Sequence, residues 1–124
     1  MFRRILIVDD NPAVRYSVRR CIEANTTCDV CGEADNGHSA IEMVVQLNPD
    51  IVLLDFQMPL MNGLDAAREI ARLAPKTTVL LFTMHESEQL VQAARAVGVR
   101  KVISKSASLA DHLLACLHSM TAEN

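Results

Sequence analysis

Aromatic residues are scarce in this sequence. Its 124 residues include three Phe, one Tyr and no Trp, although half of all residues are hydrophobic. A chain of this length is long enough to bury one core, so we expect a single domain over residues 1–124. Its core must be built from aliphatic side chains and alanine.

Long runs of one residue type are also absent. No apolar stretch approaches the length that spans a membrane, and the apolar run at residues 5–8 is too short for a signal peptide. The net charge is −3 and no long basic run occurs, which argues against nucleic acid as a direct partner of this segment. We therefore expect a cytoplasmic protein that binds neither membrane nor nucleic acid through this segment.

Four cysteines raise the question of a metal site or a disulfide. Cys28 and Cys31 form a CxxC within a predicted strand, where residues three apart point to opposite faces. No second CxxC or CxxH completes a zinc site. Cys21 and Cys116 fall on the apolar faces of predicted helices. We interpret all four as buried, unreactive thiols.

The hydrophobic pattern predicts five strands that alternate with five helices. The strands are expected at residues 4–8, 28–34, 51–55, 78–82 and 101–104, and the helices at residues 12–24, 38–47, 64–73, 87–97 and 109–120. Such alternation implies a parallel sheet with helices on both faces. The common order for five doubly wound, flavodoxin-like strands is 2-1-3-4-5. The second strand is the least hydrophobic and is expected at an edge.

Polar residues stand at the ends of four predicted strands. Asp9 and Asp10 follow the first, Asp55 ends the third, Thr83 follows the fourth and Lys105 follows the fifth. Because the carboxyl ends of parallel strands share one edge, these side chains should meet where open α/β sheets bind ligands. Crowded carboxylates repel one another unless a hard cation joins them or one stays protonated. Oxygen ligands of this kind suit Mg²⁺.

These groups match the needs of phosphoryl transfer. Thr83 offers a hydroxyl and Lys105 a cation, and both could stabilise the oxygens of a transferring phosphoryl group together with Mg²⁺. Asp55 lies between them and is the predicted nucleophile for a covalent acyl phosphate.

Four segments then resemble the motifs of a known family. They are ILIVDDNP, LLDFQMPLMNG, LLFTMH and VISK, in this order along the chain. Their order and spacing are similar to those of the receiver domain of bacterial two-component response regulators, over nearly the whole chain. GEADNGHSAIEMV and LLFTMH are closest in character to the LuxR/NarL-type subgroup, whose receivers usually precede a helix-turn-helix domain.

The resemblance implies roles for the acidic residues. Asp55 would be the phosphoacceptor, Asp10 would bind Mg²⁺ directly, and Asp9 would bind it mainly through water. The backbone carbonyl of Gln57 would be a further ligand. The phosphoryl donor would be a sensor histidine kinase or phosphotransfer protein, or a small acyl phosphate.

The resemblance also implies a conformational switch. Thr83 would hydrogen-bond the phosphoryl group, Lys105 would pair with it, and the surface of the last two helices and the last strand would shift, with homodimerisation as one outcome. Many family members carry Tyr or Phe three residues before the lysine, as the partner of the threonine movement. Val102 stands there in this chain, which leaves two alternatives open: this surface does not read out the switch, or it does so without an aromatic side chain.

Three alternatives stay open. A pseudo-receiver would act as an interaction module without phosphate; Val102 favours it, whereas the intact acidic and lysine positions oppose it. A Mg²⁺-dependent phosphohydrolase of the dehalogenase type would need DxD after the first strand and a cap domain, whereas this chain has DD and no length for a cap. A flavodoxin would need a Ser/Thr-rich phosphate loop after the first strand, which is missing, and aromatic residues for the flavin.

Overall fold

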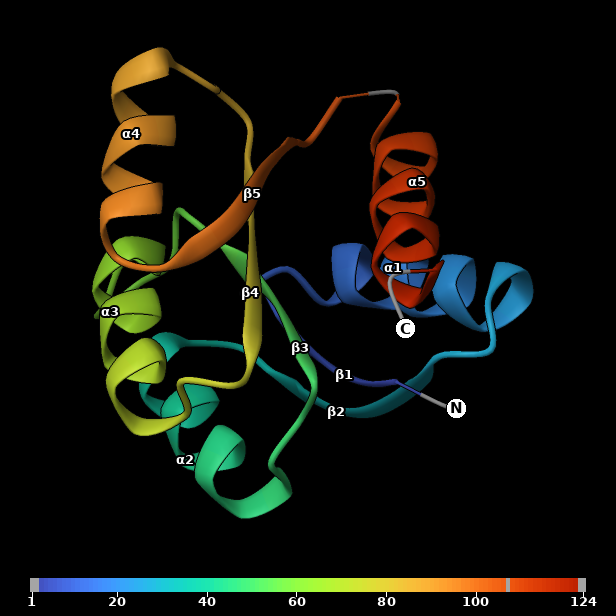
Figure 1. The fold of residues 1–124 in the computed structure, drawn as a ribbon, viewed down its shortest axis with the longest axis horizontal. Coiled ribbons are helices and arrows are strands. Elements are labelled where there is room, and N and C mark those ends of the chain that lie inside the picture. Colours follow the sequence, from blue (N-terminus) through green and yellow to red (C-terminus); the bar gives the residue numbers. More distant parts are fainter. Residues whose placement is uncertain (1–2, 107, 123–124) are drawn as a thin grey trace.

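The computed structural model describes residues 3–106 and 108–122 and shows a parallel sheet between two layers of helices (Figure 1). The strands are β1 (Arg4–Val8), β2 (Asp29–Ala34), β3 (Ile51–Asp55), β4 (Thr78–Thr83) and β5 (Val99–Ser104). The helices are α1 (Pro12–Asn25), α2 (Gly37–Leu47), α3 (Gly63–Leu73), α4 (Glu88–Ala96) and α5 (Leu109–Ala122). All neighbouring strands pair in parallel, in the order β2-β1-β3-β4-β5. The predicted fold class and strand order are confirmed, with β2 at an edge.

Two separate cores hold the layers together. One lies between the sheet and α1 and α5, and the other lies between the sheet and α2, α3 and α4 (Figure 1). The first four residues of β3 are fully buried and contribute alternately to the two cores. A strand covered on both faces needs apolar residues at every position, which explains its unbroken run IVLL.

Side-chain caps fix where four helices begin. Asn11, Asn36, Asn62 and Ser87 each accept a hydrogen bond from a backbone N–H in the first turn of the following helix. Such caps satisfy amide groups that have no partner within the helix. The connection between β1 and α1 is only three residues long. Asp9 and Asp10 are therefore held between a buried strand and a capped helix.

The pairing of β1 with β2 is irregular at Cys31. Ile5 lies opposite Val30 and Leu6 lies opposite Gly32, so that Cys31 is an extra residue on the edge strand. Val30 therefore packs into the core beneath α1 and α5, while Ala34 packs into the other core, although a regular strand would place both on one face. The bulge leaves Glu33 facing α1, where it contacts Arg15.

Two predictions need correction. Cys28 and Cys116 are buried, but Cys21 and Cys31 are partly exposed, so burial of all four thiols was wrong. For Cys31 the physical reason is its place in the bulge. The last strand begins at Val99 rather than 101, because a second register shift, at Arg100, lets Val99 pair with Val79. Gly98 precedes it with φ of +96°, a conformation that glycine adopts without strain.

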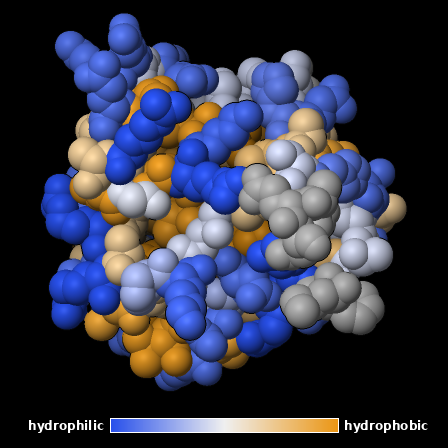
Figure 2. Space-filling model, in the orientation of Figure 1, coloured by the Kyte–Doolittle hydropathy of each residue, from blue (hydrophilic) through white to orange (hydrophobic). Residues whose placement is uncertain are grey.

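One face of the molecule is mainly hydrophilic at its rim (Figure 2). Apolar side chains show through near the centre of this face and again at the lower left, over the region of α2 (Figure 2). Among the described helices, none combines the length and the apolar character needed to cross a membrane.

Candidate functional site

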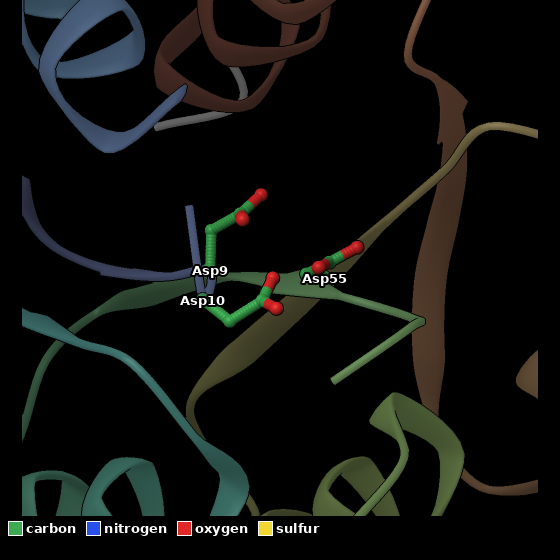
Figure 3. A group of neighbouring side chains, drawn as sticks. All are labelled: Asp9, Asp10 and Asp55. Atoms are coloured by element: carbon green, nitrogen blue, oxygen red, sulfur yellow. The ribbon is translucent and has the colours of Figure 1, made fainter. Parts of the chain in front are cut away.

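Three carboxylates meet at the carboxyl edge of the sheet. β1 and β3 are hydrogen-bonded neighbours, so the residues that end them lie side by side. Asp9, Asp10 and Asp55 each offer an oxygen within 4.8 Å of the others. Figure 3 draws the three side chains together. Asp9 and Asp55 are buried, whereas Asp10 is exposed. The predicted acidic cluster is therefore present, and it is open to solvent on the Asp10 side.

One ammonium group serves the two buried carboxylates. Lys105 Nζ lies 2.7 Å from Asp9 Oδ2 and 2.9 Å from Asp55 Oδ1. Burial alone would lower the pKa of Lys105, but its contacts with Asp9 and Asp55 outweigh burial, and the pKa is raised. Lys105 is thus a firmly charged cation, and it faces more negative charge than it can neutralise.

Ionisation of Asp55 is disfavoured by this lack of positive charge. Burial raises the pKa of its carboxyl group, the Lys105 ammonium opposes the shift, and the nearby Asp9 carboxylate adds to it. The Gln57 N–H also donates to Asp55 Oδ1, at 3.3 Å. A carboxyl group that resists ionisation in this way has free energy to gain from a further cation.

Thr83 lies at the same edge, at the buried end of β4. Its backbone carbonyl accepts a hydrogen bond of 2.7 Å from the Lys105 N–H, which ties the ends of β4 and β5 together. Its hydroxyl accepts from the His85 N–H at 3.2 Å and donates to the His85 carbonyl at 3.4 Å. The hydroxyl is therefore held by its own loop in this conformation.

Val102 is buried in the core beneath α4, opposite Leu81. A crevice of about 320 Å³ lies beside it between α4 and β5, with Val91, Ala94 and Val99 in its wall. The Val102 side chain forms part of the wall of this crevice.

Two residues support the acidic cluster but were not predicted as part of the site. The Arg15 guanidinium donates to the backbone carbonyl of Asp9 at 2.6 Å. Gly63 lies against the carbonyl of Asp55, which would be only 2.5 Å from a Cβ at this position. Neither contact has a sequence signal, because each depends on how a loop returns to the strand end.

Comparison with known proteins identifies relatives of this arrangement. Residues 5–117 match the response regulator receiver domain family. The transcriptional regulatory protein YxjL of Bacillus subtilis is 39% identical over 88 residues, which are 71% of this chain and 40% of that protein. The chemotaxis protein CheY of Thermotoga maritima is 36% identical over 105 residues, which are 85% of this chain and 87% of that protein.

A solved structure has nearly the same fold. A two-component response regulator of the LuxR family from Aurantimonas sp. superimposes with a TM-score of 0.92 and is 30% identical, covering 100% of this chain and 88% of that one. Several curated relatives are much longer than the chain, which spans 40% of the Bacillus subtilis regulator and 43% of the regulator DegU of Brevibacillus brevis.

Proposed function

Because the chain belongs to the response regulator receiver domain family, whose members are phosphoacceptor signalling modules, we propose that Asp55 is its phosphoacceptor and that residues 1–124 form one receiver domain. One observation carries the assignment. Asp55 is a buried carboxylate at the end of β3, 2.9 Å from Lys105 Nζ, and its oxygen lies within 4.8 Å of oxygens from Asp9 and Asp10.

This geometry supports a phosphoryl transfer to Asp55. An Asp55 carboxylate oxygen attacks the phosphorus of a phosphohistidine, an O–P bond forms, and the P–N bond breaks with its electron pair left on the imidazole nitrogen. With a small acyl phosphate, a P–O bond breaks instead and a carboxylate leaves. Lys105 stabilises the charge on the phosphoryl oxygens. Thr83 donates its hydroxyl hydrogen to one of them after leaving the His85 carbonyl.

The donor set fits Mg²⁺. The cluster consists of hard oxygen ligands, its two buried members share a single ammonium group, and its third member is exposed. Asp9, Asp10 and Asp55 would hold the ion, with the Gln57 carbonyl as a further ligand. When bound, Mg²⁺ would supply positive charge to the phosphoryl oxygens.

Receiver domains interact with kinases and other signalling proteins, and we propose a sensor histidine kinase or phosphotransfer protein as the donor for this chain. Phosphorylation would draw Thr83 inward and alter the surface of α4, β5 and α5, without an aromatic residue at Val102. We also propose that the chain forms a homodimer and lies in the cytoplasm. By analogy with the transcriptional regulators that it resembles, we propose that it is part of a longer protein with a DNA-binding region.

Intact-protein mass after incubation with acetyl phosphate and Mg²⁺ tests the acceptor. The chain should gain one phosphoryl group, and Asp55→Asn should gain none. Asp50→Asn is the matched control, because Asp50 precedes the same strand at its opposite end and an asparagine there can still accept the Arg4 N–H. Omission of Mg²⁺ should abolish the gain. If the chain gains no mass and also fails to bind beryllofluoride, the pseudo-receiver alternative replaces the proposal.

A further inference from the structure

Arg15 connects the acidic site to a neighbouring strand. Its Nη1 donates to the carbonyl of Asp9 at 2.6 Å, and its Nε donates to Glu33 Oε1 on β2 at 3.0 Å. We propose that Arg15 is a positioning residue for the metal site, which holds the β1–α1 turn so that Asp9 and Asp10 face Asp55. This inference rests on the proposed Mg²⁺ site.

The carbonyl that Arg15 binds controls the direction of Asp10. It belongs to the peptide unit that joins Asp9 to Asp10, and a peptide unit is planar. Fixing its oxygen therefore fixes the plane of this peptide unit and the position of the Asp10 Cα, from which the Asp10 side chain extends. The Asp9 side chain is fixed separately, by the Asn11 N–H at 2.8 Å and by Lys105 at 2.7 Å. Asp10 is the exposed member of the cluster and depends on the backbone for its orientation.

Glu33 orients Arg15. The bulge at Cys31 turns Glu33 toward α1, where its two oxygens contact different arginines. Oε1 pairs with Arg15, whose side chain is only 18% exposed, and Oε2 pairs with Arg19 Nη1 at 2.8 Å. Arg19 lies one helical turn further along, is 39% exposed, and also contacts Glu23 at 3.5 Å. The two arginines share a carboxylate but differ in their relation to Asp9, which makes Arg19 a natural control.

Charge alone predicts the opposite effect on metal binding. Arg15 is a cation beside a site for a dication, so removing its charge should strengthen Mg²⁺ binding if electrostatic repulsion dominates. Removing a positioning contact should weaken Mg²⁺ binding, because partners that orient metal ligands are commonly worth about 10–100-fold in affinity. The sign of the change therefore separates the two roles.

Isothermal titration calorimetry of Mg²⁺ into the 124-residue chain measures this sign without any phosphoryl donor. We expect Arg15→Met to weaken the Mg²⁺ affinity by about tenfold, and Arg19→Met to leave it unchanged or slightly strengthened. Far-UV circular dichroism and thermal unfolding confirm that each variant is folded. An Arg15→Met variant that binds Mg²⁺ as tightly as Arg19→Met, or more tightly, overturns the inference.

Arg15→Lys provides a second test at constant charge. A lysine carries its three N–H donors on one nitrogen and cannot present two separate nitrogens, as Arg15 presents Nη1 to the Asp9 carbonyl and Nε to Glu33, so the affinity should again fall. Should Arg15→Met fail to fold, this variant decides, and an unchanged affinity contradicts the positioning role. Absence of Mg²⁺ binding by the unsubstituted chain would instead refute the proposed metal site on which the inference rests. The mass experiment with Asp55→Asn would still test Asp55 as the acceptor separately.

Discussion

Glu33 and Asp55 are two carboxylates that differ in how much positive charge lies beside them. Glu33 lies on the edge strand, is 29% exposed, and has two arginines as partners. Arg19 and then Arg15 lower its pKa, against the opposing effect of burial. Asp55 lies on the central strand, is 4% exposed, shares one lysine with Asp9, and has a raised pKa.

The contrast separates a structural carboxylate from one that is available for chemistry. Glu33 has all the positive charge that it needs within the chain, so its ionised form stabilises the fold. The ionised form of Asp55 lowers the stability of the folded state, and a bound cation or a covalently attached group would remove this destabilisation. A carboxyl group whose pKa is raised by burial and by a neighbouring carboxylate, within a cluster of such groups, is typical of functional sites.

The largest effect is expected from the glycines beside the two carboxylates. A Cβ at Gly63 would lie 2.5 Å from the Asp55 carbonyl oxygen and 2.8 Å from the Phe56 Cα, both of them backbone atoms. Gly63→Ala should therefore lower the free energy of unfolding by about 3 kcal/mol. A Cβ at Gly32 would meet side-chain ends, those of Leu47 at 3.0 Å, Met43 at 3.2 Å and Leu6 at 3.4 Å. Gly32→Ala should cost less than about 1 kcal/mol.

Urea unfolding followed by far-UV circular dichroism measures both variants, since the chain has no tryptophan for fluorescence. Equal losses at the two glycines would show that the backbone around Asp55 yields as readily as flexible side-chain ends, against the tight packing inferred at the site.

Removal of the shared cation should have the next largest effect. Lys105→Met leaves Asp9 and Asp55 buried without their common partner, and we expect a loss of about 2 kcal/mol in Mg²⁺-free buffer. Excess Mg²⁺ should recover part of this loss by neutralising the same carboxylates. Lys101→Met is the control, because Lys101 is an exposed residue of β5. A Lys105→Met variant as stable as the control would mean that the two carboxylates need no cation in the folded state.

Neutralising Asp55 and neutralising Glu33 should change the free energy of unfolding in opposite directions. At neutral pH without Mg²⁺, Asp55→Asn should raise the free energy of unfolding by about 1 kcal/mol, because a raised pKa means that ionised Asp55 is disfavoured by folding. Glu33→Gln should lower it by about 1 kcal/mol, because hydrogen bonds to two cations are weakened. Urea unfolding gives both values, and changes of the same sign would contradict the division into structural and available carboxylates.

The acidic site was more predictable from sequence than the Glu33 cluster. Asp55 ends a strand, and Asp9 and Lys105 each follow one. Because the carboxyl ends of parallel strands must share an edge, the alternation of strands and helices was enough to bring them together. Glu33 required knowledge of the bulge at Cys31, because a regular alternation of side chains would misplace the residues after it. The contact between Arg15 and Glu33 depends on that bulge and was missed with it.

The Thr83 hydroxyl shows a second limit. Its place at the strand end was predicted, but the rotamer that it adopts depends on the backbone of the following loop, through the His85 N–H and carbonyl. Sequence periodicity describes which face a residue occupies and carries no information about such local choices. The same limit applies to Gly63, whose close approach to Asp55 arises from the path of the β3–α3 loop.

The smallest expected effect is the acid dependence of the Glu33 cluster. A lowered pKa means that Glu33 stabilises the folded state above its ordinary value of 4.5 and that this contribution is lost as the pH falls through the folded-state pKa. The difference in free energy of unfolding between the unsubstituted chain and Glu33→Gln should therefore be constant from neutral pH to about pH 4.5 and should shrink below it. Urea unfolding across this pH range measures this difference.

Glu69→Gln is the control for this prediction. Glu69 also pairs with an arginine, Arg72, but on the open surface, where solvent screens the pair and no measurable difference is expected. A gap for Glu33→Gln that persists unchanged well into acid would mean that the shape of the side chain, and not its charge, holds β2 to α1.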